Sequence, residues 1–308
     1  MKGMETKVIH LMGTVIQLQI AHENPKPILE EAERRLRIYE KRFSANDANS
    51  ELMAVNKNAG IQAVQVHPEL YELIKIGQLH SVAPNSRMNI AIGPLVQTWR
   101  IGFADAKVPT DEEVQQKLSQ TNPQAIICDD AQSTVFLAEA DMAIDLGALA
   151  KGYFADLLRT YFEEVGVQSA LINLGGNLVV YGPCPNRTSG IWKIGIQDPL
   201  KERNHYLLSL NVQNRSIVTS GIYERQLVHK GKTYHHILNP QTGYPAETDV
   251  VSLTIVSKQS LDGEIWTTRL FGQNANEILS QLNQLAEIDG IIVTSQQILF
   301  SEGIKKYL

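Results

Sequence analysis

The sequence predicts an α+β fold in which mixed sheets and helices form one unit. Strand-like and helix-like segments are both frequent in the 308 residues, but they do not alternate in the regular strand–helix–strand order of a parallel sheet. No internal repeat and no linker-like segment divides the chain. We therefore expect residues 1–308 to form a single domain with two interleaved subdomains.

The first half of the chain predicts a strand pair followed mainly by helices. Apolar and polar residues alternate from 8 to 20 around Gly13, which indicates two short strands or one bent strand. Apolar residues then recur at spacings of three and four from 29 to 43, behind Pro25 and Pro27, which predicts a helix. The other expectations are a polar loop at 44–50, helices after Pro68 and at 110–118, and a hairpin of 125–128 with 134–137.

The second half is richer in glycine and predicts most of the strands. A helix is expected over 148–165, where Gly166 ends it, and a buried strand over 170–174 stops at Gly175-Gly176. Further strands are expected up to 181 and at 192–196, 206–212, 216–219, 226–229 and 250–256. Helices are expected at 262–271 and 275–286, and a closing hairpin at 290–300.

Composition excludes several classes of protein. Hydrophobic residues make up 43% of the chain and charged residues 20%, which is ordinary for a globular domain and excludes a disordered chain. A net charge of −5 offers no basic surface for nucleic acid. Cys128 and Cys184 form neither a zinc motif nor a disulfide framework. The sequence has no stretch of about 20 apolar residues and therefore predicts no transmembrane segment.

The start of the chain bears on its compartment. No apolar signal region is present there, and a strand pattern begins at Val8. The sequence as it stands therefore predicts a cytoplasmic protein. If a leader originally preceded this chain, an extracytoplasmic lipoprotein is the alternative.

Two segments that contain glycine could bind a phosphate group. In residues 145–153, Asp145 precedes Gly147, and Lys151 follows at the expected start of a helix, where free backbone N–H groups bind anions. An ordinary capped helix with a surface lysine explains the same segment. Gly175-Gly176, after a buried strand, either admits a ligand close to the backbone or forms a hairpin turn.

Two further segments carry side chains suited to catalysis. His235 and His236 precede a loop rich in proline and glycine, and a histidine can act as a general base near neutral pH. Alternation along a strand would instead put one histidine in the core and the other in water. Glu264 and Thr268 are four residues apart on an expected helix, so they share a face and could bind Mg²⁺. The same spacing is common on solvated helices.

Well-known catalytic motifs are absent from the sequence. It contains no GxSxG nucleophile elbow, no HExxH zinc motif and no GxGxxG dinucleotide fingerprint. A Rossmann fold is therefore excluded by motif as well as by the order of the strands.

Taken together and in this order, the segments resemble the ApbE family of FAD:protein FMN transferases. The resemblance covers nearly the whole chain. The matching residues are Met12-Gly13-Thr14; Phe43-Ser44 with Ser50-Glu51-Leu52 and Asn56; Gly93-Pro94-Leu95-Val96 with Trp99; Asp145-Leu146-Gly147-Ala148 with Ala150-Lys151-Gly152-Tyr153 and Asp156; Asn173 with Gly175-Gly176; Ser220-Gly221 with Tyr223-Glu224-Arg225; and His236-Ile237 with Pro240, Thr242-Gly243 and Pro245.

The resemblance implies a fold and a reaction. The fold would be an ApbE-like, T-fold-related architecture with an FAD cleft between two subdomains. The enzyme would transfer FMN from FAD to a threonine or serine hydroxyl of a target protein through a phosphoester bond, release AMP and require Mg²⁺. The target would carry an Asp-x-x-(Ser/Thr)-Gly-Ala-(Ser/Thr)-like motif. An FAD pyrophosphatase and a catalytically weak FAD-binding protein are the alternatives.

The resemblance also implies roles for individual residues. His236 would be the general base, and Glu264, Thr268 and the main-chain carbonyl of Ala148 would bind the metal. The positions expected to line the FAD cleft are Met12, Ser44, Lys151, Asn173, Ser220 and Gly221. Glu264 departs from the family, which usually has aspartate there. Smaller departures are Asn239 in place of an aspartate, and Met88-Asn89-Ile90-Ala91 in place of a segment that has an acid and a hydroxyl.

Overall fold

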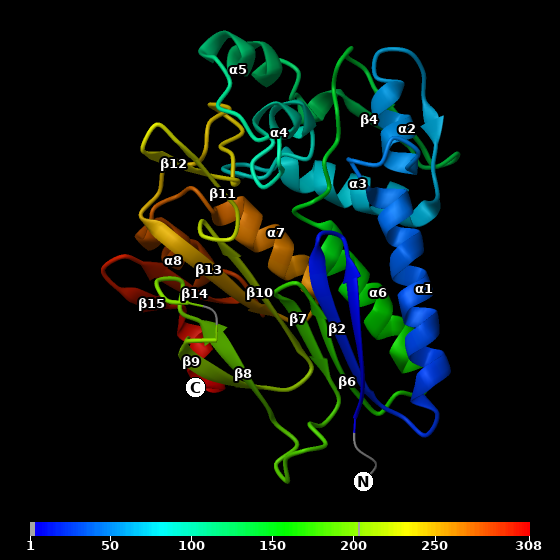
Figure 1. Cartoon of the computed structure of the whole chain (residues 1–308), viewed down its shortest axis with the longest axis vertical. Helices are drawn as coiled ribbons and strands as arrows, with labels where there is room; N and C mark the ends of the chain where they lie inside the picture. Colours follow the sequence, from blue (N-terminus) through cyan, green and yellow to red (C-terminus); the bar gives the residue numbers. More distant parts are fainter. Residues whose placement is uncertain (1–3, 203) are drawn as a thin grey trace.

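The computed structural model describes residues 4–202 and 204–308, and its centre is a large antiparallel sheet (Figure 1). In these residues the sheet has eight strands in the order β1-β2-β6-β7-β10-β13-β14-β15. Their bounds are β1 (Glu5–Leu11), β2 (Thr14–Ala21), β6 (Ser169–Leu174), β7 (Asn177–Tyr181), β10 (Arg215–Gly221), β13 (Val250–Ser257), β14 (Asp289–Thr294) and β15 (Ile298–Phe300).

Both faces of this sheet are covered because its buried strands are apolar on both sides. Ile255 and Ile292 pack towards helices, whereas their neighbours Val256 and Ile291 pack on the opposite face. The helical face carries α1 (Pro25–Phe43), α6 (Ala150–Glu164), α7 (Ser260–Leu270) and α8 (Ala275–Leu282). The other face carries the hairpin of β8 (Trp192–Gln197) and β9 (Tyr206–Val212), with the 3₁₀ segment η2 (Glu302–Tyr307).

A second group of elements lies beyond the end of the sheet where the β1–β2 turn is found (Figure 1). It consists of α2 (Glu51–Lys57), α3 (Pro68–Ser81), α4 (Gly93–Trp99), α5 (Asp111–Leu118), the 3₁₀ segment η1 (Pro123–Ala125), β3 (Val64–Gln65), β4 (Ile126–Asp129), β5 (Thr134–Leu137), β11 (Gln226–His229) and β12 (Lys232–His235). No helix among the described residues is long and apolar enough to cross a membrane.

The chain leaves the large sheet after β10 and packs on this second group before it returns as β13. Trp99 of α4 donates a hydrogen bond from Nε1 to the Gly243 carbonyl at 2.9 Å, and its ring lies 5.5 Å from that of Tyr234. Leu95, Val114 and Leu238 complete this small apolar cluster. Segments far apart in sequence are thus interleaved, while the division into two subdomains stays a prediction.

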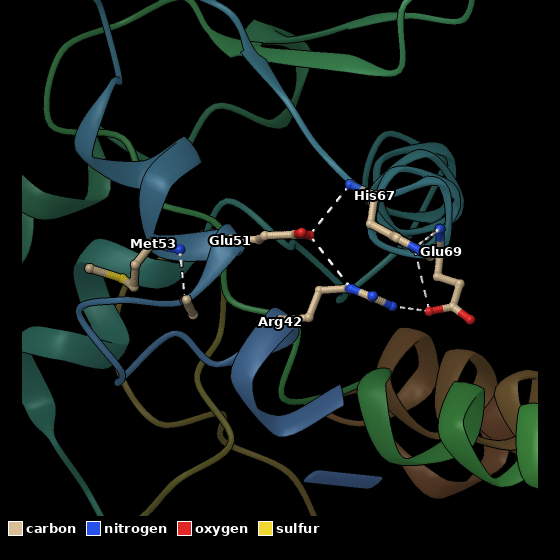
Figure 2. Close-up of polar contacts among 6 residues, drawn as sticks. Arg42, Glu51, Met53, His67 and Glu69 are labelled. Atoms are coloured by element: carbon tan, nitrogen blue, oxygen red, sulfur yellow. Dashed lines mark hydrogen bonds and ion pairs between the residues drawn. The ribbon is translucent and has the colours of Figure 1, made fainter. Parts of the chain in front are cut away.

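An ionic cluster holds the loop 44–50 in place at the end of α1 (Figure 2). Arg42 lies between Glu51 at the start of α2, at 3.6 Å, and Glu69 in the first turn of α3. Ser50 caps α2 by accepting a hydrogen bond from the backbone N–H of Met53 at 2.9 Å. The Ser50 hydroxyl donates back to the Ser44 carbonyl at 2.6 Å, which closes the loop. Ser44, Ser50 and Glu51, which belong to a segment that resembles the family, therefore help to stabilise this loop.

Most predicted elements are confirmed, with differences at ends and in short helices. The first strands form a true hairpin, because Met12 and Gly13 adopt left-handed backbone angles (φ 54° and 67°). Helix α6 begins two residues later than expected, since the Leu149 N–H bonds to the Leu146 carbonyl in a separate turn. Helix α8 ends at Leu282 rather than at 286. Helices α2 and α4, each seven residues long, were not predicted.

Candidate active site

Several loops meet at the end of the sheet that faces the second group of elements. The register pairs Leu174 with Asn177 in the β6–β7 hairpin, and Asn177 with Val218 of β10. The β1–β2 and β6–β7 turns touch: a Cβ added to Gly175 would lie 2.3 Å from the Thr14 hydroxyl oxygen. Gly175 also has a positive φ of 69°, so only glycine suits this close approach.

Three of the positions predicted to line an FAD cleft, Met12, Ser220 and Gly221, lie at this end of the sheet. Met12 lies in the β1–β2 turn, where its N–H donates to Glu40 of α1 at 2.8 Å. Ser220 and Gly221 end β10. Ser44 lies at the end of α1, where its hydroxyl accepts bonds from the backbone N–H groups of residues 46 and 47.

Asn173 is placed differently from the others. It alternates with the α6-facing Ile172 and Leu174, so its side chain lies on the other face of the sheet, where Oδ1 accepts from the Gly176 N–H at 3.0 Å. The amide therefore supports the glycine turn. Its contact with FAD stays a prediction, as do the contacts of the other five positions.

A hollow of about 300 Å³ opens beside the loop that follows α1. Its lining includes Ala45, Asn46, Met53, Asn56 and Ile144. Asn56 pairs with the backbone of Ile144 in both directions, at 3.0 and 2.8 Å. This pairing holds the segment that leads to residues 145–149.

The segment before α6 exposes backbone groups. Asp145 accepts a hydrogen bond from the Gly147 N–H at 2.7 Å, and Gly147 and Ala148 are both exposed. Burial raises the pKa of Asp145, while this hydrogen bond and the Arg225 guanidinium oppose the rise. Asp145 thus stabilises the turn at Gly147, while the role of the Ala148 carbonyl as a metal ligand stays a prediction.

Helix α7 packs closely against α6 and carries two of the three predicted metal ligands, Glu264 and Thr268. A Cβ on Gly152 would lie 2.7 Å from both Cγ of Glu264 and the Ser260 carbonyl oxygen, so a side chain there would push the helices apart. Asp156 of α6 accepts bonds from the Ser260 and Leu261 N–H groups, each at 2.8 Å, and so caps the start of α7. Burial raises the pKa of Asp156 to about 6.

The oxygens of α7 fit a hard divalent cation. Glu264 is buried, 5% exposed, and its Oε1 accepts from Asn177 at 3.1 Å and lies 3.8 Å from the Lys151 ammonium. Among the described residues, neither Oε2 of Glu264 nor the hydroxyl of Thr268 one turn later has a hydrogen-bond partner. Among the described residues, no group of three His, Cys, Asp or Glu side chains could hold a metal ion by itself, so a cation here would need hydroxyl and carbonyl ligands as well.

His236 directly follows β12 and is half-buried, as is His235. Neither histidine lies in the core or in open water. Nδ1 of His236 is 3.4 Å from the Arg225 carbonyl oxygen, which can only accept, so Nδ1 carries the proton and Nε2 keeps a free lone pair. Burial lowers the pKa of His236 most, and together with the Arg225 guanidinium and the Lys151 ammonium it brings this pKa to about 4.

Replacing Arg225 with glutamine should raise the pKa of His236 from about 4 towards the 6.5 of free imidazole, without reaching it, because burial remains. The measurement is a pH titration of the His236 ring resonances by NMR. In the parent, stability should fall as the pH drops from about 6.5 to about 4, since the unfolded chain binds the proton first. If the titration midpoint of His236 is the same in the variant, the Arg225 guanidinium does not contribute to the lowered pKa of His236.

The structure thus connects three of the predicted site residues, Lys151, Glu264 and His236. Lys151 contacts Glu264 and acts electrostatically on His236, and Arg225 acts on both His236 and Asp145. Residues 12–292 match the sequence profile of the ApbE family. The chain belongs to the ApbE family.

Curated ApbE relatives resemble this chain over most of its length. One from Klebsiella pneumoniae (strain 342), named FAD:protein FMN transferase, is 39% identical over 287 residues, which cover 93% of this chain and 88% of the relative. One from Treponema pallidum (strain Nichols), with the same name, is 32% identical over 310 residues, covering 96% and 86%. The solved structure of the ApbE protein from Thermotoga maritima has a TM-score of 0.90 at 26% identity and covers 99% of both chains.

Sequence reasoning overlooked several residues of this ApbE site. Arg225 and Asp156 lie in segments that resemble the family, but no role was expected for their charges. Asn177, which ends the segment with the double glycine, was given no role, and Ser260 was not singled out. A buried asparagine beside a glycine turn indicates a site residue only when the carboxylate that it binds is known.

Proposed function

We propose that this ApbE chain transfers FMN from FAD to a threonine or serine hydroxyl of an acceptor protein, with release of AMP and a requirement for Mg²⁺. The observation that carries the proposal is the grouping of a neutral histidine, a lysine and a buried carboxylate at one end of the sheet, namely His236, Lys151 and Glu264. The name shared by the curated relatives supports the same activity.

His236 supplies the base in this proposal. The acceptor hydroxyl oxygen forms a bond to the phosphorus of the FMN half, and the bond from that phosphorus to the AMP oxygen breaks. The hydroxyl proton passes to Nε2 of His236, which has a lone pair because Nδ1 faces the Arg225 carbonyl. The product is a phosphoester between the acceptor and FMN, and AMP leaves with the bridging oxygen.

Phosphoryl transfer depends mainly on positioning and on neutralising charge, and the site offers both. Lys151 supplies a positive charge at the start of α6, and its ammonium is partly exposed. The exposed turn at Gly175-Gly176 and the turn at Met12 lie near the same sheet end, where Ser220 and the buried Gly221 end β10. With Ser44 and Asn173, these positions are our proposal for the FAD cleft.

Glu264, Thr268 and the Ala148 carbonyl would hold Mg²⁺. When bound, the ion would neutralise charge on the pyrophosphate oxygens. The extra methylene of Glu264, compared with the aspartate usual in the family, is accommodated because Gly152 leaves room beside its Cγ. The acceptor in this proposal carries the Asp-x-x-(Ser/Thr)-Gly-Ala-(Ser/Thr)-like motif.

Intact mass spectrometry of an acceptor tests this function. A purified acceptor with the motif is incubated with the chain, FAD and Mg²⁺, and a parallel acceptor has its final motif hydroxyl residue changed to alanine. We expect a gain of one FMN on the first acceptor only, and its loss when the metal is chelated. AMP without a mass gain would indicate the pyrophosphatase instead. Bound FAD with neither product would indicate the weak FAD-binding protein.

A further inference from the structure

A chain of buried polar side chains leads to Glu264 from the middle of the sheet. The Ser216 hydroxyl of β10 donates to the Ser260 hydroxyl at 2.9 Å, and Ser260 donates to Oδ1 of Asn177 at 2.6 Å. Nδ2 of Asn177 then donates to Oε1 of Glu264 at 3.1 Å. All four residues are buried, with exposed fractions between 0 and 5%. We call Ser216, Ser260 and Asn177 the relay.

The relay determines which way the Asn177 amide points. The two ends of an asparagine amide have nearly the same shape, so its orientation depends on hydrogen-bond partners. The Ser260 hydroxyl donates to the oxygen end, which turns the nitrogen end towards Glu264. A buried carboxylate thereby receives a donor, without which its burial would be unfavourable.

Close packing leaves Glu264 little freedom to adopt another rotamer. Besides the contact of Gly152 with Glu264, a Cβ on Gly263 would lie 2.5 Å from Cγ2 of Val218, so α7 touches both α6 and β10. One carboxylate oxygen is held by Asn177, with the Lys151 ammonium at 3.8 Å. The other oxygen has no hydrogen-bond partner among the described residues. The carboxylate is therefore held in place with one oxygen available.

We propose that Asn177 is a positioning residue for Glu264, and that the relay sets the affinity of this site for a divalent cation. The proposal rests on the proposed function, which makes Glu264 a metal ligand. Partners that hold a ligating side chain commonly contribute 10–100-fold to metal affinity. The relay provides such a partner for a glutamate, which has one more rotatable bond than the aspartate usual in the family.

Calorimetric titration with Mn²⁺, without FAD, tests the relay directly, because Mn²⁺ accepts the oxygen ligands that suit Mg²⁺. We expect Asn177→Leu to weaken Mn²⁺ binding roughly 10–100-fold. Ser260→Ala should also weaken Mn²⁺ binding, because the Asn177 amide is then free to turn its oxygen towards Glu264. The loss should be smaller than for Asn177→Leu, because the amide donor is still present. Ser257→Ala is the matched control: its buried hydroxyl bonds to the Gln259 carbonyl near α7 and lies outside the relay. That control should bind Mn²⁺ like the parent.

A double-mutant cycle separates positioning from general loss of structure. In a Glu264→Gln background, adding Asn177→Leu should change Mn²⁺ affinity less than about twofold, because the carboxylate that Asn177 holds is already gone. Parent-like Mn²⁺ binding by both Asn177→Leu and Ser260→Ala would overturn the relay proposal while leaving FMN transfer intact. Equal losses in the two backgrounds would overturn it too. A parent that binds no Mn²⁺ would overturn both the relay and the metal part of the proposed function.

Discussion

Replacing His236 with alanine is expected to slow FMN transfer by roughly 10²–10⁴-fold while FAD affinity changes little. The reason is that Nε2 of His236 is the free basic nitrogen of this ring, since Nδ1 faces the Arg225 carbonyl. Burial and Arg225 lower the pKa to about 4, so the ring is neutral and able to accept a proton throughout the neutral pH range. Single-turnover transfer to an acceptor gives the rate, and flavin fluorescence gives the affinity for FAD.

His235 provides the matched control for this experiment. It is also half-buried, its Nε2 donates to the Ala246 carbonyl oxygen at 2.9 Å, and its basic Nδ1 is buried out of reach of an acceptor hydroxyl. His235→Ala should therefore retain far more activity than His236→Ala. Transfer at the parent rate by the His236 variant would remove this residue from the role of base.

Replacing Glu264 with alanine is expected to abolish metal-dependent transfer. The variant loses the buried carboxylate of the predicted metal site, and leaves the Asn177 amide and the Lys151 ammonium without their shared partner. The measurement is the transfer rate as a function of Mg²⁺ concentration. Glu264→Asp should keep the metal dependence, because it restores the residue that is usual in the family, and we expect its affinity for Mg²⁺ to rise.

Asp262 offers the control carboxylate for the metal prediction. It lies on the same helix but two residues away, so its side chain points off the face that Glu264 and Thr268 share. Asp262→Asn should respond to Mg²⁺ like the parent. If Glu264→Ala also titrates like the parent, the assignment of this metal ligand is wrong.

Local sequence signals were sufficient for most secondary structure. Spaced apolar residues predicted α1, and Thr110 forms the full capping box that begins α5. A turn was one of two interpretations at Gly13 and at Gly175-Gly176, and the structure contains both turns, because positive backbone angles are a property of a few neighbouring residues. Helices α2 and α4 were not predicted, because seven residues are too few to show a helical repeat of apolar residues. Tertiary contacts stabilise such short helices.

Sequence patterns were enough to assign the α+β class, most of the elements in their order and, through the resemblance to a family, the residues to examine. Which of these residues meet depends on the tertiary fold. Asn177 and Glu264 are 87 positions apart, and they are joined because strand register places Asn177 beside Val218, and Val218 packs against Gly263 of α7. The free nitrogen of His236 depends likewise on the Arg225 carbonyl across the β11–β12 hairpin. Hydrogen bonds and pKa shifts act over a few ångströms in space, and sequence patterns report only neighbours along the chain.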